Sequence, residues 1–345
     1  MKNILSVIIA LFALIVTGCT KEFPQEENEP RTVVVSVNME SPEDTRVSLT
    51  STATTPHGLS LQWEEGDKLM LCFEHNFSNF YHNDAPMVPG SIRNGGKVAD
   101  FIITIPTEIP DDAKFNLYAV YQKTDGDDTN GGYFKPGTRE YVFEDYESLC
   151  ITLNQPGYIP RPMLYFSKKN ITKTANPDIG TITLNHSGWI LAYHLKNSTG
   201  LTIGYPWYMS LYSEQSWVAN GQGTNDGLRF NFFNNKFQGG GGGTLNLNIN
   251  SPYYPQAPYF SAQLPNGGVV TFYRWVATSR IPTPLQAESR INNPIPEPGK
   301  PSNIGMSSTK KLTPKDPIAN GKVYHIYTEI TISGGEYTIE FVPPY

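Results

Sequence analysis

The residue with the clearest chemical role in this sequence is Cys19, which directly follows the short sequence Val16-Thr17-Gly18. This spacing is typical of a lipobox, in which the cysteine thiol accepts a diacylglycerol and a signal peptidase cuts just before it. Each buried methylene of the acyl chains contributes about 0.8 kcal/mol to membrane attachment. Cys19 is therefore the predicted lipidation site. The alternative is an ordinary export signal in which Cys19 has no role.

The segment before Cys19 has the composition of an export signal. Lys2 supplies the positive charge, and an uninterrupted apolar run from Ile4 to Val16 follows it. That run is shorter than the roughly 20 residues that a transmembrane helix needs. We therefore expect residues 1–18 to be a lipoprotein signal peptide and the mature protein to be held at a membrane surface by its lipid.

Candidate metal ligands are few and poorly spaced. His75, His82 and Asp84 could converge on a metal ion, but they match no ligand spacing that we recognise, and a solvated loop is the simpler interpretation. Residues 125–131 resemble a calcium loop, yet Asn130 stands at the glycine position and Pro136 at the position of the bidentate glutamate. We favour a polar hairpin tip there, and we expect no metal and no cofactor.

The sequence contains no motif of a catalytic site. There is no G-x-S-x-G elbow, phosphate-binding loop, dinucleotide fingerprint or zinc-protease motif. The 32 acidic residues necessarily include pairs that could hydrolyse a glycosidic bond, and only geometry can identify such a pair. We therefore expect no catalytic residues and no enzymatic activity.

Two cysteines remain after lipidation, Cys72 and Cys150. Export from the cytoplasm makes a disulfide between them possible. Both lie in short apolar segments that look like strands, where small buried thiols are common. We favour free thiols, and the disulfide is the alternative.

Charge and composition exclude some functions and predict a tether. The formal net charge is -6, which argues against binding to nucleic acid or to anionic lipid. The segment from Thr20 to Arg31 is acidic and contains Phe23 as its one large apolar residue. Such a segment cannot bury enough surface to offset the entropy lost on ordering, so we expect a flexible connection between Cys19 and the folded part.

The rest of the sequence has the two-residue alternation of β-strands. Apolar residues alternate with polar ones over several segments, and no window sustains a helical period. The clearest alternating sets occur within residues 33–39, 59–63, 115–121, 245–249 and 337–341. Glycine-containing turn sequences separate them. Because the length suggests two domains, we expect an all-β protein of two β-sandwiches.

A proline-rich stretch between Ser148 and Thr183 is the expected domain junction. The predicted division is therefore a signal peptide at 1–18, an acidic tether with a removable strand at 19–46, an N-terminal sandwich at 47–175 and a C-terminal sandwich at 176–345. Lys168-Lys169-Asn170 is expected to form a turn near this junction.

Five short motifs together resemble the fimbrillin (Mfa-like) family, the lipoprotein precursors of type V pili. The motifs span nearly the whole mature chain, and each one alone has low specificity. They are Thr45–Leu49, Leu61–Leu69, Ile182–His186, Trp189–Tyr193 and Gly321–Tyr324. The resemblance implies two tandem transthyretin-like Greek-key sandwiches and a precursor anchored in the outer membrane.

The resemblance also implies a mode of assembly. In that family an arginine-specific protease removes the N-terminal segment, and a strand from a neighbouring subunit replaces it. Arg46 and Val47 would flank the cleaved bond here, and Thr32 to Met39 would be the removed strand. The alternative is that Arg46 is a solvated loop arginine that is not cut. Ser41 to Thr45, which is polar, is expected to be exposed. The implied partners are other pilus subunits, joined by β-strand donation, and a host protein or glycan as adhesion ligand.

The alternative function is a surface glycan-binding lipoprotein. Aromatic side chains that stack on sugar faces would carry it, although core and hairpin aromatics explain the same residues. The candidates are Tyr205, Trp207, Tyr253, Tyr254 and Tyr259.

Overall fold

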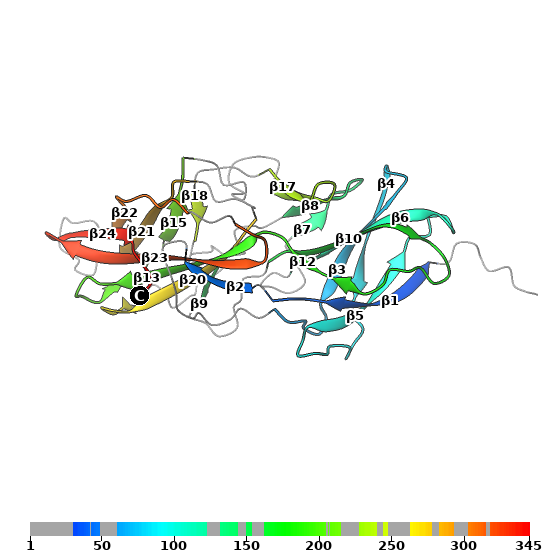
Figure 1. Ribbon diagram of the computed structural model, residues 1–345, viewed down its shortest axis with the longest axis horizontal. Coiled ribbons are helices and arrows are strands. Elements are labelled where there is room, and N and C mark those ends of the chain that lie inside the picture. Colours follow the sequence, from blue (N-terminus) through cyan, green and yellow to red (C-terminus); the bar gives the residue numbers. More distant parts are fainter. Residues whose placement is uncertain are drawn as a thin grey trace, which may run out of the picture.

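The protein is built from β-strands, and the described part contains no helix (Figure 1). The computed structural model describes residues 30–41, 43–48, 61–122, 132–143, 150–153, 162–204, 206, 208–214, 228–239, 244–247, 263–277, 283–292, 303–314 and 318–345. Within these residues there is accordingly no helix that could cross a membrane. Figure 1 shows an elongated molecule with two sandwiches arranged along its long axis.

The N-terminal sandwich packs a three-stranded sheet against a five-stranded sheet. The first has the order β11-β1-β5, with β1 (Arg31–Asn38), β5 (Val98–Ile105) and β11 (Ile182–Thr183). The second has the order β12-β10-β6-β3-β4, with β3 (Lys68–His75), β4 (Asn79–Pro86), β6 (Lys114–Tyr121), β10 (Leu164–Thr172) and β12 (Asn185–His186). Buried residues of both sheets, including Val37, Phe101, Leu71 and Leu117, form one core cluster.

The C-terminal sandwich packs a six-stranded sheet against a four-stranded sheet. The six-stranded sheet has the order β2-β23-β13-β20-β9, and β24 also pairs with β23. Its strands are β2 (Glu43–Ser48), β9 (Cys150–Leu153), β13 (Trp189–Asn197), β20 (Val269–Val276), β23 (Lys322–Ser333) and β24 (Glu336–Phe341). The facing sheet contains β15 (Tyr208–Tyr212), β18 (Thr244–Asn246), β21 (Gln286–Asn292) and β22 (Asn303–Ser307). A small ribbon of β14 (Ile203–Gly204) and β19 (Gln263–Leu264) completes this half.

A sixth sheet, which we call the bridging sheet, joins the two sandwiches. It consists of β7 (Gly132–Phe134), β8 (Glu140–Phe143), β16 (Arg229–Asn231) and β17 (Lys236–Gln238). Its aromatic side chains contact both halves: Phe232 lies 5.1 Å from Tyr118 of β6, and Phe143 lies 5.6 Å from Trp275 of β20, between ring centroids. The C-terminal core therefore continues through the bridging sheet to the outer face of the five-stranded sheet, where Cys72 lies.

The all-β, two-sandwich architecture expected from the sequence is confirmed, and several details differ. Strands β1, β6 and β24 occupy three of the alternating segments, and β18 covers the start of the segment at 245–249. Leu61 and Trp63 are buried, as expected for an apolar face, but they lie outside any strand. The predicted turn at Lys168–Asn170 is instead a bulge within β10, where Asn170 has φ 59°. A strand continues through such a bulge because only one of its residues leaves the ladder.

Strands cross the expected boundary between residues 175 and 176 in both directions. Strand β9, from the first half of the chain, pairs with β20 in the C-terminal sandwich. Strands β11 and β12, from the second half, pair with β1 and β10 in the N-terminal sandwich. The chain therefore enters the N-terminal sandwich after β9 and returns to the C-terminal sandwich at β13.

Candidate functional site

The most informative local structure is the position of β1, which occupies the strand expected at Thr32–Met39. All eight residues of β1 pair with β5 in antiparallel register, from Arg31 opposite Ile105 to Asn38 opposite Val98. On its other side, β1 pairs in parallel with β11. β1 thus lies inside its sheet, and the five-stranded sheet covers one of its faces (Figure 1).

The inward face of β1 is part of the N-terminal core. Val35, Val37 and Met39 are 4%, 0% and 1% exposed, while Val33 is half-buried at the edge of the core. Burying a side chain of this kind contributes about 1.5 to 3 kcal/mol, which is an upper range because unfolded chains already bury some surface. Three such side chains make β1 an integral strand rather than a loosely attached one.

The outward face of β1 makes a polar contact with β5 and with Arg93, which precedes β5. The Ser36 hydroxyl donates to Asp100 Oδ1 at 2.7 Å, and Arg93 Nη2 donates to both Ser36 Oγ and Asp100 Oδ1 at 2.8 Å. The Arg93 guanidinium and the Ser36 hydroxyl hold the pKa of Asp100 below its usual value. The three side chains form a closed ring of hydrogen bonds on the outer surface of the sheet.

A second polar contact lies at the start of β1. Arg31 Nη2 donates to Asp111 Oδ2 at 2.9 Å, and this contact lowers the pKa of Asp111. Behind Asp111, Lys173 is 2% exposed and its Nζ donates to the carbonyl oxygens of Pro106 and Ile109 at 3.1 and 2.6 Å. Lys173 Nζ is also 3.7 Å from Asp111 Oδ1. The Asp111 carboxylate therefore lies between one cation from β1 and one from the body of the sandwich.

The chain after β1 runs from the N-terminal to the C-terminal sandwich. His186 Nε2 donates to the Glu40 carbonyl oxygen at 2.8 Å, and the Leu61 backbone N–H donates to Ser41 Oγ at 3.0 Å. Strand β2 then pairs in parallel with β23, with a break in register between Asp44 and Ser48. The segment expected to be exposed at Ser41–Thr45 is therefore a half-buried Ser41 followed, from Glu43, by a paired strand.

The two residues of the predicted cleavage site, Arg46 and Val47, lie in β2 within this irregular stretch. Cleavage between them stays a prediction. The predicted lipidation site Cys19, the signal peptide and the tether before residue 30 lie outside the described residues.

The candidate metal ligands do not form a site. His75 and His82 lie in the β3–β4 hairpin and bond to the carbonyl oxygens of Lys114 and Thr138, and Asp84 pairs with Lys68. Burial lowers the pKa of His82. Among the described residues, no three His, Cys, Asp or Glu side chains are close enough to hold a metal ion. The simpler interpretation of a solvated loop was also wrong, because these residues belong to paired strands.

Of the other candidate residues, one cysteine is described in full and the rest are partly or wholly outside the described residues. Cys72 is a buried free thiol in β3, as favoured from the sequence, and burial raises its pKa. Cys150 lies in strand β9, and its side chain is outside the described part. The calcium-like segment 125–131 and all five candidate sugar-stacking aromatics also lie outside the described residues. These are Tyr205, Trp207, Tyr253, Tyr254 and Tyr259.

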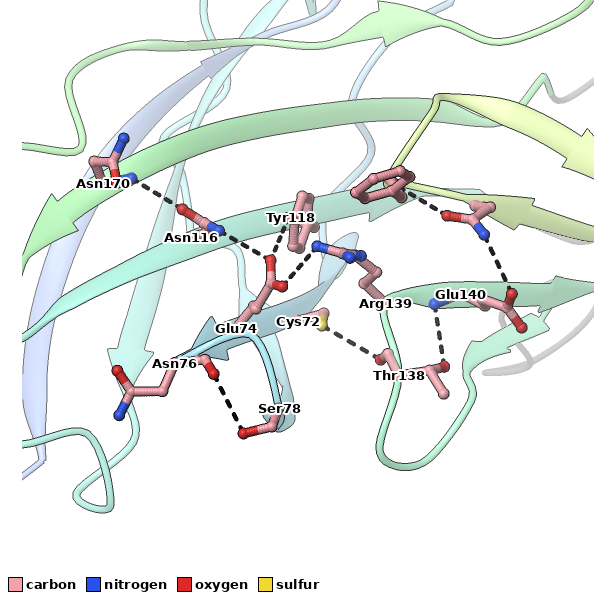
Figure 2. Close-up of polar contacts among 12 residues, drawn as sticks. Cys72, Glu74, Asn76, Ser78, Asn116, Tyr118, Thr138, Arg139, Glu140 and Asn170 are labelled. Carbon is pink, nitrogen blue, oxygen red and sulfur yellow. Dashed lines mark hydrogen bonds and ion pairs between the residues drawn. The ribbon is translucent and has the colours of Figure 1, made fainter.

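Sequence reasoning missed a buried ionic network centred on Glu74 of β3 (Figure 2). Glu74 is 1% exposed and accepts hydrogen bonds from Asn116 Nδ2, Tyr118 Oη and Arg139 Nη1 at 2.9, 2.6 and 2.6 Å. Burial and the Glu74 contact raise the pKa of Tyr118 to about 12. Arg139 comes from the β7–β8 turn and also lies over the Phe233 ring at 4.8 Å. The network attaches the bridging sheet to the N-terminal sandwich.

The Glu74 network had one sequence signal, a glutamate that directly follows the apolar run Leu69–Phe73. A carboxylate in such a strand must find a cationic or hydrogen-bonding partner if it is buried. The sequence does not identify that partner, because Arg139 is 65 residues away along the chain.

Comparison with known proteins gives only distant similarity. No family model matches the sequence, and no curated protein matches it. A putative cell adhesion protein from Bacteroides fragilis NCTC 9343 is 9% identical, with 90% of this chain and 97% of that chain covered and a TM-score of 0.43. A putative adhesin from Bacteroides ovatus is 9% identical, with 93% and 95% covered and a TM-score of 0.40. A putative cell adhesion protein from Bacteroides eggerthii DSM 20697 is 13% identical, with 91% and 97% covered and a TM-score of 0.37. At these identities and TM-scores, the comparisons assign the chain to no family.

Proposed function

We propose that this protein is a fimbrillin-like pilus subunit, or a pilus-associated surface lipoprotein, with a role in adhesion. The lipid on Cys19 holds the precursor at the outer membrane, and cleavage after Arg46 separates the lipid and β1 from the body of the protein. A strand from another subunit then replaces β1. The observation that carries the proposal is that β1, an inner strand of its sheet, comes from the segment that this cleavage detaches.

Loss of β1 would leave a groove suited to another strand. The backbone of β5 would lose its partner over Val98–Ile105, and the short strand β11 would lose its partner as well. The buried side chains of Phe101, Ile103 and Ile105 would lose the cover that β1 provides. An uncovered apolar strand edge of this kind is a template for strand addition.

Burial of a donated strand would offset much of the cost of association. A donated strand that buries three side chains gains about 1.5 to 3 kcal/mol for each, in addition to the ladder hydrogen bonds. These gains oppose an association cost of about 4 to 15 kcal/mol. The side-chain gain is of the same size as this cost, so slow dissociation depends on the ladder hydrogen bonds that a matching strand adds.

Access to Arg46 requires only a local opening. Strand β2 has three register pairs with β23, separated by an irregular stretch that contains Arg46. Short, interrupted pairing of this kind opens at a lower free energy than the whole fold. The same opening would uncover the part of the β23 edge that β2 occupies.

The test is to treat the full-length protein with an arginine-specific protease and to follow its mass by light scattering and by gel electrophoresis without boiling. We expect N-terminal sequencing to find Val47 and the mass to increase through assembly. The variant Arg46→Lys, which keeps the charge, should stay monomeric. The matched control Arg31→Lys should assemble like the wild type, because cleavage after Arg31 leaves β1 attached to the body.

A protein that is cut after Arg46 and remains a folded monomer at high concentration would reject self-assembly by this route. Assembly of Arg46→Lys to the same extent as the wild type would reject the role of the Arg46–Val47 bond.

A further inference from the structure

The three valines of β1 do not by themselves define its position in the groove. Val33, Val35 and Val37 are three identical side chains at alternate positions on the same face. A one-residue slip would turn this face outward and is excluded by the core. A two-residue slip, however, would keep valine at two of these three positions. Another feature must therefore distinguish the observed register from registers displaced by two residues.

The contact at Ser36 depends on the register. Ser36 is directly opposite Asp100, and its hydroxyl both donates to Asp100 and accepts from Arg93. A hydroxyl can make both bonds, whereas an alanine or valine at this position can make neither. The groove residues Asp100 and Arg93 thus recognise a hydroxyl at one position of the strand between them.

The groups that recognise the hydroxyl are held in place by residues other than β1. The Asp100 backbone N–H donates to Ser91 Oγ at 3.0 Å, and Arg93 Nη1 donates to the Ser91 carbonyl oxygen at 3.0 Å. Arg93 also pairs directly with Asp100. The arrangement therefore needs no strand to form, and preorganised groups of this kind bind without the cost of ordering.

The ion pair between Arg31 and Asp111 is a second contact that depends on the register of β1, and it is independent of Ser36. Arg31 lies at the end of the inward row of β1, and Ser36 lies on the outward face. Asp111 accepts from Arg31, and the buried Lys173 lies behind Asp111. A strand satisfies both contacts only if its basic residue and its hydroxyl residue are five positions apart.

A register displaced by two residues in either direction would lose the ion pair with Asp111. If the strand moved two residues in one direction, Val34 would lie opposite Asp100 and Glu29 would take the place of Arg31 near Asp111. Two carboxylates would then face each other, which is unfavourable. In the other direction, Asn38 would lie opposite Asp100 and Val33 would take the place of Arg31. Each displaced register therefore loses the ion pair with Asp111.

We propose that Arg93 with Asp100, and Asp111 with Lys173, are the specificity-determining residues of the strand-binding groove. They select a strand from another chain that carries Arg or Lys, then Ser or Thr five positions later, with small apolar residues on the inward face. They also set the register of that strand. This inference rests on the proposed function, because it concerns which strand replaces β1.

The first experiment measures strand release from the full-length protein. A recognition sequence for a site-specific protease is inserted between Ser48 and Leu49, the purified protein is cut there, and the cut segment is exchanged for a fluorescent peptide of residues 30–48. Release of the peptide is followed by fluorescence anisotropy after an excess of unlabelled peptide is added.

The peptide Ser36→Ala should leave about five to ten times faster than the wild-type peptide, because it loses hydrogen bonds to charged groups. The peptide Ser36→Thr should restore slow release, since the hydroxyl is kept. The peptide Arg31→Ala should leave about two to three times faster, as expected for a partly exposed ion pair, and Arg31→Lys should restore slow release. Thr32→Ala, at an exposed position, is the matched control and should change nothing.

The second experiment reads the register directly. Val34 lies opposite Ile102 in the observed register, and a two-residue slip would place it opposite Thr104 or Asp100. A peptide with Val34→Cys should form a disulfide with an Ile102→Cys protein and not with a Thr104→Cys protein. When the peptide also carries Arg31→Ala and Ser36→Ala, it should react with both proteins.

The outcomes separate the inference from the proposed function. If the wild-type peptide binds the groove but Ser36→Ala is released at the same rate and the double variant links only to Ile102→Cys, the inference is wrong and the proposed function stands. If the wild-type peptide never enters the groove of the cut protein, strand replacement fails, and the inference fails with it.

Discussion

The two sandwiches are connected by two structures that differ in how they are held. One is the bridging sheet, formed by β7, β8, β16 and β17. The other is the segment from Arg31 to Ser48, which we call the strap, with β1 in the N-terminal sandwich and β2 in the C-terminal one. The bridging sheet is held by clustered aromatic rings and the buried carboxylate of Glu74. The strap has apolar contacts on one side and partly exposed polar contacts on the other.

Under the proposed function, the bridging sheet is the connection that stays and the strap is the one that is replaced. The aromatic rings around Phe232 and Phe143 pack within the core, and the bridging sheet also carries a buried charge pair that is costly to break. The polar contacts of β1 are made by side chains that water can reach, such as Arg93 and Asp111, whose side chains are 42% and 44% exposed. If the strap leaves, as proposed, the bridging sheet still connects the two sandwiches.

The largest effect is expected from breaking the strap at its better-held end. Val37 has β5 on one side and β11 on the other, so Val37→Pro removes a ladder hydrogen bond and disturbs a fully buried position. We expect it to destabilise the N-terminal sandwich by at least about 3 kcal/mol in urea unfolding. Thr45→Pro, in the irregular stretch of β2, is the matched comparison and should cost less than about 1 kcal/mol.

Equal costs for these two proline variants would mean that β1 and β2 are held equally firmly. The proposal that β2 opens at a lower free energy than the rest of the fold would then be wrong.

A somewhat smaller loss of stability is expected when the ion pair that attaches the bridging sheet is broken. Arg139→Met leaves Glu74 buried with only Asn116 and Tyr118 as partners, and breaking a buried pair in this way costs about 3 kcal/mol. Glu74→Gln should cost less, because the side chain of Arg139 is 22% exposed and can turn toward water. Urea unfolding of both single variants and of the double variant measures the coupling. A double variant that loses the sum of the two single losses would show that the pair does not act as a unit.

The parts of the fold that could be predicted from the sequence are those set by residues close together along the chain. Alternation located β1 and β24 because each strand buries one face, and that pattern is visible within a few residues. Alternation carries no information about the partner strand. The pairing of β9 with β20, and of β8 with β16, therefore could not be predicted. The same limit applies to β2, whose polar sequence indicated an exposed segment although its backbone pairs with β23.

The candidate site was predictable to a similar extent. The apolar row from Val33 to Met39 identified the strand from its own sequence. Its polar contacts could not be found in this way, because Ser36 and Arg31 look like ordinary solvent-facing residues until Asp100 and Asp111 are placed beside them. Recognition of a strand depends on residues distant in sequence, and these become neighbours only in the fold.

The smallest expected effect is a dependence of strap release on pH. The pKa of Asp111 is lowered mainly by Arg31, which belongs to the strap, whereas the pKa of Asp100 is lowered mainly by Arg93, which belongs to the body. A carboxylate with a depressed pKa stabilises the bound state above its unperturbed pKa of about 3.9, and this contribution is lost as the pH falls through the depressed value. Release of the fluorescent peptide should therefore be constant from pH 7 to 5 and accelerate below about pH 4. Asp111→Asn should flatten this acceleration more than Asp100→Asn does. Acceleration between pH 7 and 5 would contradict this assignment and would point instead to His186, which donates to the Glu40 carbonyl oxygen.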